Sequence, residues 1–165
     1  MAKSSSILFL LCAALCAAAG GIHGRHSGDA SCDSLRACDF QRFKVIFELS
    51  AAQAGHRQIQ ATVHGGHFCS NLTARTILAV AGADLDSAHD ARQVILGSVV
   101  NNLTVPADVQ KAGVFALQLA QFQLTLLNGN GTHSDVNDTL LQEVQSHLAG
   151  ALEASNFVVA NCAGV

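Results

Sequence analysis

The stretch SDVNDTLLQEVQSHLAGAL, from Ser134 to Leu152, decides the fold class of this chain. Its main apolar residues recur every four positions and form one stripe, made of Val136, Leu140, Val144, Leu148 and Leu152. This periodicity predicts an amphipathic α-helix, which we expect to run on toward Cys162. Ser134 can cap the helix, and Asp135 and Asp138 favour the positive end of its dipole.

Further helices are predicted upstream of this stretch. Residues 106–128 favour a helix with Pro106 near its first turn, and apolar side chains cover most of its sides. A helix of that kind usually lies at the centre of its domain, so we expect it to be central. Residues 70–83 and 86–102 indicate two shorter helices, each begun by Ser or Asp and separated from the other by acidic residues.

The region 38–67 has two interpretations. Phe40, Phe43 and Phe47 fit helix spacing, and the alanines after them continue a helix over 37–54 without a breaker. The same region also alternates between apolar and polar residues in two short runs, which fits a β-hairpin over 43–64. We favour the helix.

The prediction is therefore an all-α, disulfide-stapled bundle of four or five helices. Its predicted core is formed by Phe43, Phe47, Ile77, Val94, Phe115, Leu119, Phe122, Leu140, Val144 and Leu148.

The N-terminus has the pattern of a secretory signal. Lys3 supplies a positive charge, residues 7–19 are uncharged and apolar, and Ala17 and Ala19 form a small-x-small pattern. We therefore predict a signal peptide at 1–19, a flexible leader at 20–31 and a single helical domain at 32–165. The apolar run is too short to span a bilayer, so we expect no membrane insertion and a secreted, extracellular protein.

Cysteines and sequons support this expectation. Cys32, Cys38, Cys69 and Cys162 remain after removal of the signal, and an even number in an exported chain predicts two disulfides. Three pairings are open, and each of them ties Cys162 back to the N-terminal half. The triplet Asn-x-Thr predicts glycosylation at Asn71, Asn102, Asn130 and Asn137.

No pattern in the chain indicates catalysis. It contains neither Gly-x-Ser-x-Gly nor a glycine-rich phosphate loop, so we expect no enzyme and no cofactor. His64 and His67, with His56 nearby, form the densest histidine group, but no carboxylate accompanies them and we expect no metal. The net charge of −3, without a basic cluster, argues against a nucleic-acid partner.

Residues 109–162 resemble the middle of a type I interferon. In that family a Phe-Gln-Lys-Ala box opens a helix, a leucine-rich run follows, and a Thr-Leu-Leu box opens a helix that ends at a cysteine. The matching pieces are Val109–Ala112, Phe122–Leu127, Thr139–Leu141, Leu152-Glu153 and Cys162, and Cys32–Arg36 resembles the start of some interferons. The tryptophan before the Thr-Leu-Leu box is missing, and so are the two helices that follow in that family with their Cys-Ala-Trp element, so a receptor surface that depends on those helices is not carried over.

This resemblance implies a cytokine-like bundle, as an alternative to a plain up-and-down bundle. It also implies that Cys32 pairs with Cys162, which would leave Cys38 to pair with Cys69. The other pairing that we consider is Cys38 with Cys162 and Cys32 with Cys69.

Three functions remain open. The first is a helical cytokine-like ligand of a cell-surface receptor, whose candidate contacts are the polar residues Arg42, Lys44, Glu48, Gln145 and Glu153. The second is a secreted carrier of an apolar small ligand or lipid, because the helix at 106–128 is apolar on most sides. The third is a protease-inhibitor-like protein, motivated by the hairpin alone, since a Gln-x-Val-x-Gly loop is missing.

Overall fold

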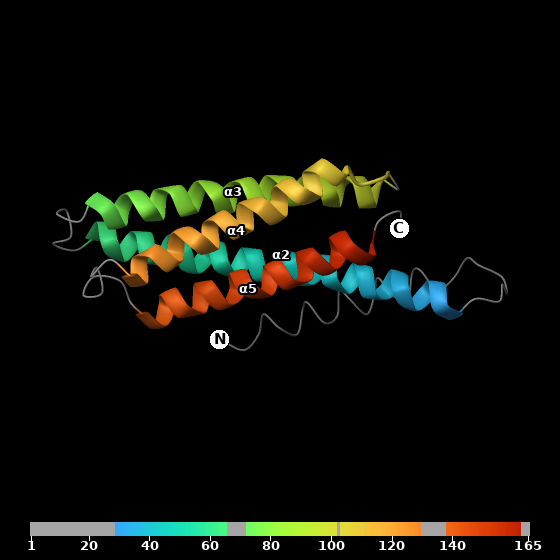
Figure 1. The fold of residues 1–165 in the computed structure, drawn as a ribbon, viewed down its shortest axis with the longest axis horizontal. Coiled ribbons are helices and arrows are strands. Elements are labelled where there is room, and N and C mark those ends of the chain that lie inside the picture. The colour runs from blue at the N-terminus through green and yellow to red at the C-terminus, as the bar shows by residue number, and fades with distance from the viewer. Residues whose placement is uncertain (1–28, 66–71, 102, 130–137, 163–165) are drawn as a thin grey trace. The chain divides into compact units, whose positions relative to one another are not determined.

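The computed structural model describes residues 29–65, 72–101, 103–129 and 138–162. The chain divides into two compact units, Met1–Cys32 and Asp33–Val165, and the fold described below is that of the second unit. The described residues form four α-helices and no strand: α2 (Asp29–Gly65), α3 (Leu72–Val100), α4 (Ala107–Gly129) and α5 (Asp138–Asn161) (Figure 1). None of these helices is both long and apolar enough to cross a bilayer.

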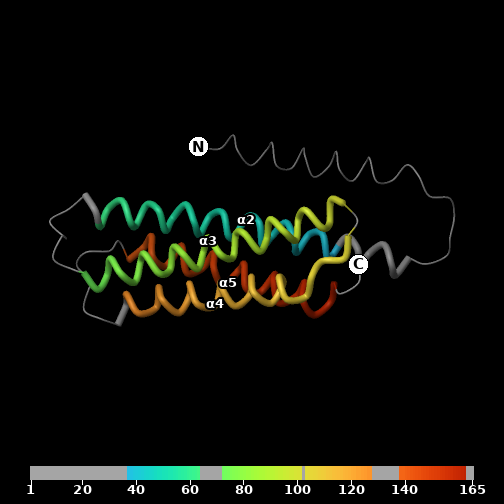
Figure 2. Tube along the Cα trace, turned by 90° about the horizontal axis from the view of Figure 1, so that it is seen from above, coloured from blue at the N-terminus to red at the C-terminus, as the bar shows by residue number. Residues whose placement is uncertain are grey.

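Each helix runs antiparallel to its neighbours in the bundle. Contacts between α2 and α3 run in opposite directions along the two helices, since Ile46 meets Arg92 and the later residue Gln53 meets the earlier residue Asp86. The same holds for α2 and α5, and α4 packs against both α3 and α5. The order around the bundle is therefore α2, α3, α4, α5, with α2 and α4 at opposite corners (Figure 2).

The connections between the helices are short, at 66–71, 101–106 and 130–137. Short connections between antiparallel neighbours define an up-and-down bundle, whereas cytokine bundles have two long crossovers. Of the two predicted topologies, the structure has the up-and-down one.

The core consists mainly of leucine and alanine. Each helix directs one row of these residues inward, and the fully buried members include Leu49, Ala52, Leu78, Ala81, Leu117, Ala120, Leu124, Val144, Leu148 and Ala151. The alanines allow the helix backbones to approach closely. Gly55 allows it further, because a Cβ at this position would lie 2.5 Å from Cγ2 of Val144.

The favoured helix over 37–54 is confirmed, because it lies within α2. The alternative, a β-hairpin at 43–64, does not form, since α2 continues through that whole region. The fifth helix is also absent from the described residues, because the segments predicted at 70–83 and 86–102 are one helix, α3. The acidic residues between them do not end the helix, since Ala81, Leu85 and Ala88 keep its buried row continuous.

The predicted core is partly wrong. Ile77, Val144 and Leu148 are buried, and Leu140 packs against the core from a half-buried position. In contrast, Phe43, Phe47, Val94, Phe115 and Phe122 are exposed, and Leu119 is half-buried. On α4 the Ala/Leu row faces inward and the Phe row faces outward, so α4 lies at one corner of the bundle and is not central.

A buried histidine joins α2 to α3. The Nε2–H of His56 donates to the carbonyl oxygen of Leu78 at 2.9 Å, and burial lowers the pKa of His56 below its usual value. The imidazole packs against Gly82, where an added Cβ would lie 2.9 Å from Cε1 of His56. The ring is therefore held neutral, in the tautomer protonated on Nε2.

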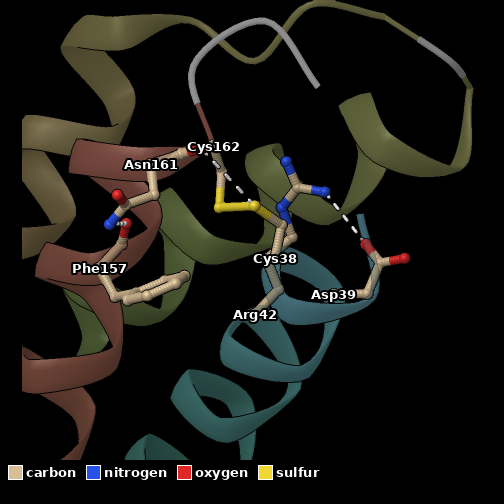
Figure 3. The surroundings of a disulfide bond; sticks show 6 residues. All are labelled: Cys38, Asp39, Arg42, Phe157, Asn161 and Cys162. Atoms are coloured by element: carbon tan, nitrogen blue, oxygen red, sulfur yellow. Dashed lines mark hydrogen bonds and ion pairs between the residues drawn. A yellow bond between two sulfur atoms is a disulfide. The ribbon is translucent and has the colours of Figure 1, made fainter. Parts of the chain in front are cut away.

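One disulfide closes the bundle between α2 and the residue that follows α5. Cys38 and Cys162 are bonded, with 5.8 Å between their Cα atoms, and both are buried with Val158 in a small cluster apart from the main core (Figure 3). This bond belongs to the second of the two predicted pairings, so the first, Cys32 with Cys162, is wrong. The side chains of Cys32 and Cys69 lie outside the described residues.

We predict that this disulfide is a major source of stability. It closes a loop with a sequence separation of 124, for which the chain-entropy model gives a contribution of about 5 kcal/mol to the free energy of unfolding. Replacing both Cys38 and Cys162 with serine should therefore lower the urea midpoint strongly while leaving a helical circular dichroism spectrum. Peptide mapping without reduction should recover Cys38 linked to Cys162, and a Cys32–Cys162 peptide would contradict the structure.

Candidate functional site

The most distinctive feature of the bundle is a cavity at its disulfide end. All four helices contribute to its walls, and the space open to the centres of water-sized molecules is about 50 Å³. The cavity lies between the main core, which supplies Leu49 and Leu117, and the disulfide cluster, which supplies Val158. Its walls are almost entirely apolar, and further lining residues are Val45, Ile95, Leu96, Val114 and Val159.

Arg92 of α3 is a charged residue in this apolar wall. Its side chain is only 9% exposed, and its Nη1 donates to the carbonyl oxygen of Ile46 on α2 at 3.3 Å. Its Nε is buried without a hydrogen-bond partner among the described residues. Burial lowers the pKa of Arg92 from its usual value. The usual pKa of arginine is so far above neutral pH that the guanidinium still keeps its charge.

Arg42 of α2 is a second buried arginine in the cavity wall. It is also 9% exposed, and its Nη1 donates to Oδ1 of Asp39 at 3.1 Å. Figure 3 shows the guanidinium beside the Cys38–Cys162 bond and directed at Asp39. Because Arg42 precedes Ile46 by one helical turn, both guanidinium groups meet the same part of α2.

Arg42 and Arg92 place positive charge in a cavity wall that is otherwise mostly apolar. Two cationic groups lie in its wall, Gln110 and Ser155 are the other polar lining residues, and no acidic residue lines it in the described part of the chain. A buried guanidinium with an unsatisfied N–H is costly, by about 1–3 kcal/mol for the hydrogen bond alone.

Of the predicted receptor contacts, Arg42 lines the cavity, whereas the other four lie elsewhere and make contacts between helices. Lys44 Nζ and Glu153 Oε2 form an ion pair at 2.9 Å between α2 and α5, and Glu48 Oε2 lies 2.7 Å from Nδ1 of His147. Gln145 Nε2 donates to the carbonyl oxygen of Leu124 on α4 at 3.2 Å. Of the five predicted contacts, Glu153 is exposed, whereas Arg42 is buried, which corrects the expectation that it lies at the surface.

The predicted glycosylation sites and the histidine group involve residues that the structure describes only in part or not at all. Asn71, Asn102, Asn130 and Asn137 lie outside the described residues, and in the chain each falls between two helices. The histidine group at 64–67 is likewise not described in its side chains. Among the residues that are described, no three His, Cys, Asp or Glu side chains come together as metal ligands.

Sequence reasoning did not find Arg92, although a signal was present. Leu85, Ala88, Arg92 and Ile95 recur at helix spacing, so Arg92 occupies a position in the buried row of α3. A charged residue in an otherwise apolar row marks a special environment, because burial of an arginine needs compensation. The cavity itself has no such signal, since it depends on how four separate helices pack.

We predict that Arg92 lowers the stability of the ligand-free protein. Arg92→Met keeps the length of the side chain and removes the buried charge, and the Ile46 carbonyl retains a partner in the Ser50 hydroxyl at 2.7 Å. The free energy of unfolding in urea should rise by about 1 kcal/mol. Arg75→Met, an exposed change on the same helix, is the control and should alter it by less than about 0.5 kcal/mol. A loss of stability in Arg92→Met would show that the guanidinium is structural.

Comparison with known proteins does not identify relatives of this chain. No family model, curated protein or solved structure matches it. The resemblance of residues 109–162 to type I interferons therefore stays a prediction, and the function has to be inferred from the geometry of the bundle.

Proposed function

We propose that the protein is a secreted glycoprotein that carries a small apolar ligand within its helical bundle. The observation that carries this proposal is the apolar cavity formed by all four helices at the disulfide end. Ligand sites in helical bundles are commonly built in this way, from side chains on facing helices.

The driving force for binding is the removal of apolar surface from water. Burial contributes about 25 cal/mol per Å² of apolar surface, and a cavity lined by aliphatic side chains offers water few hydrogen bonds. The disulfide supports the site because it ties α2 to Cys162 next to the cavity, at the residues Cys38, Val158 and Cys162. The cavity is small, so a ligand fits it either with a short apolar segment or with some separation of the helices.

Secretion and glycosylation are supported by the sequence and by the helix bounds. The signal-like N-terminus and the buried disulfide suit an oxidising compartment. All four sequons fall in the segments that connect helices, which are the expected surface sites of attached sugars.

Expression of the whole chain in a eukaryotic cell line should release a product into the medium that loses mass on treatment with peptide N-glycosidase.

We expect that filling the cavity abolishes ligand binding. Val159→Phe places a larger side chain in the cavity wall, so the secreted protein should lose at least about tenfold in affinity for decanol, measured by isothermal titration. Val94→Phe is the control, because Val94 is exposed on α3 and does not line the cavity, and it should bind as the wild type does.

Two results would contradict the carrier function. One is a wild-type protein that binds decanol without saturation, as a nonspecific apolar surface would. The other is a Val159→Phe variant that is folded and binds with unchanged affinity.

A second candidate function is that of a protein ligand for a cell-surface receptor. It is favoured by an exposed aromatic row on α2, where Phe40, Phe43 and Phe47 are 66%, 49% and 57% exposed. Their spacing places them on one side of the helix, opposite the buried row that contains Leu49. Aromatic side chains are enriched at the centres of protein interfaces, so such a row is an expected contact surface for a partner.

The receptor function is tested by changing that row. Phe43→Ser combined with Phe47→Ser should lower saturable binding of labelled protein to cells of the source organism by at least about tenfold. Phe122→Ser is the matched control, because Phe122 is equally exposed but lies on α4 at the opposite corner of the bundle. Equal binding by both variants, or no saturable binding by the wild type, would remove this candidate.

A further inference from the structure

A charge inside an apolar cavity has to be explained by what the cavity holds. Arg92 is nine-tenths buried, its Nε has no partner among the described residues, and it lines a space that is otherwise almost entirely aliphatic. For an unliganded core position a methionine or leucine would be less costly, since burial of a charge opposes folding. The guanidinium is therefore best understood as one half of an ion pair whose other half belongs to the ligand.

We propose that the ligand is an amphiphilic anion, a carboxylate with an apolar tail, whose head group binds Arg92. This inference rests on the proposed carrier function and specifies its ligand class. The tail occupies the aliphatic part of the cavity, beside Leu49, Val114 and Leu117, and the carboxylate accepts hydrogen bonds from the guanidinium.

The chemistry of the wall favours a carboxylate over other head groups. A guanidinium presents its N–H groups in a planar fork that matches the two oxygens of a carboxylate. Arg42, in the same wall, is paired with Asp39 and adds a second guanidinium near the site, and among the described residues no acidic side chain lines the cavity beside Arg92. Amines are disfavoured by the same charges, and alcohols offer one acceptor oxygen without a charge.

The test compares ligands that share one tail and differ in the head group. We expect the secreted glycoprotein to bind decanoate at least about tenfold more tightly than decanol, by isothermal titration, and decylamine most weakly. Arg92→Met should reduce the preference for decanoate over decanol to within about threefold. Arg92→Lys keeps the charge but loses the fork, so it should retain part of the preference.

Controls separate this inference from the carrier function. Arg75→Met should bind all three ligands as the wild type does, because Arg75 is exposed and lies outside the cavity wall. Arg42→Met should weaken the preference for decanoate in a folded protein even if Arg92→Met fails to fold. Circular dichroism of every variant establishes that the helices are intact.

Each remaining outcome decides the inference. Equal affinities for decanoate and decanol in the wild type would overturn it and leave the carrier function standing. A preference for decanoate that persists in both Arg92→Met and Arg42→Met would also overturn it, because the head group would then bind elsewhere. Binding of none of the three ligands would overturn the carrier function and this inference together.

Discussion

The close approach of the helices is the constraint on which the rest of the bundle depends. Buried alanines such as Ala52, Ala120 and Ala151 line the inward sides, and Gly55 brings α2 against Val144 where no side chain would fit. Helices that pack this closely leave little room for aromatic rings between them. The described phenylalanines of α2 and α4 therefore lie on the outer sides of these helices, and leucine fills the spaces between the alanines.

The cavity arises where this pattern changes. Toward the disulfide end the two arginines and the β-branched residues Ile46, Ile95 and Val159 join leucines around a space that these side chains together do not fill. A gap and a buried charge both lower stability, and proteins commonly accept such losses at sites that bind ligands. The extensive core around Leu78, Leu124 and Leu148, together with the disulfide, offsets them.

The sequence allowed the helical class to be predicted, but not which sides of the helices are buried. The buried side of α5 was clear because Val144 and Leu148 lie on its one apolar side. In contrast, α4 has two apolar sides. The prediction placed Phe122 in the core because it is the more hydrophobic residue, whereas the small Ala120 is the one that is buried. The alternation in the first part of α2 fitted a strand as well as a helix, because short apolar runs satisfy both periods. Arg92 was detectable in principle as a charge in an apolar row, but the cavity depends on the joint packing of four helices and has no local pattern.

The up-and-down topology also determines how the chain can find its fold. Each helix packs against the next one along the chain, so α2–α3, α3–α4 and α4–α5 contacts close only short loops and can form quickly. Pairing of α2 with α5 is the exception, since it joins segments as far apart as Cys38 and Cys162. Once these cysteines are bonded, the two segments do not have to find each other again on refolding, because the disulfide keeps them close together in the unfolded oxidised chain. Refolding of the oxidised protein then involves only local encounters, as in helical proteins of low contact order.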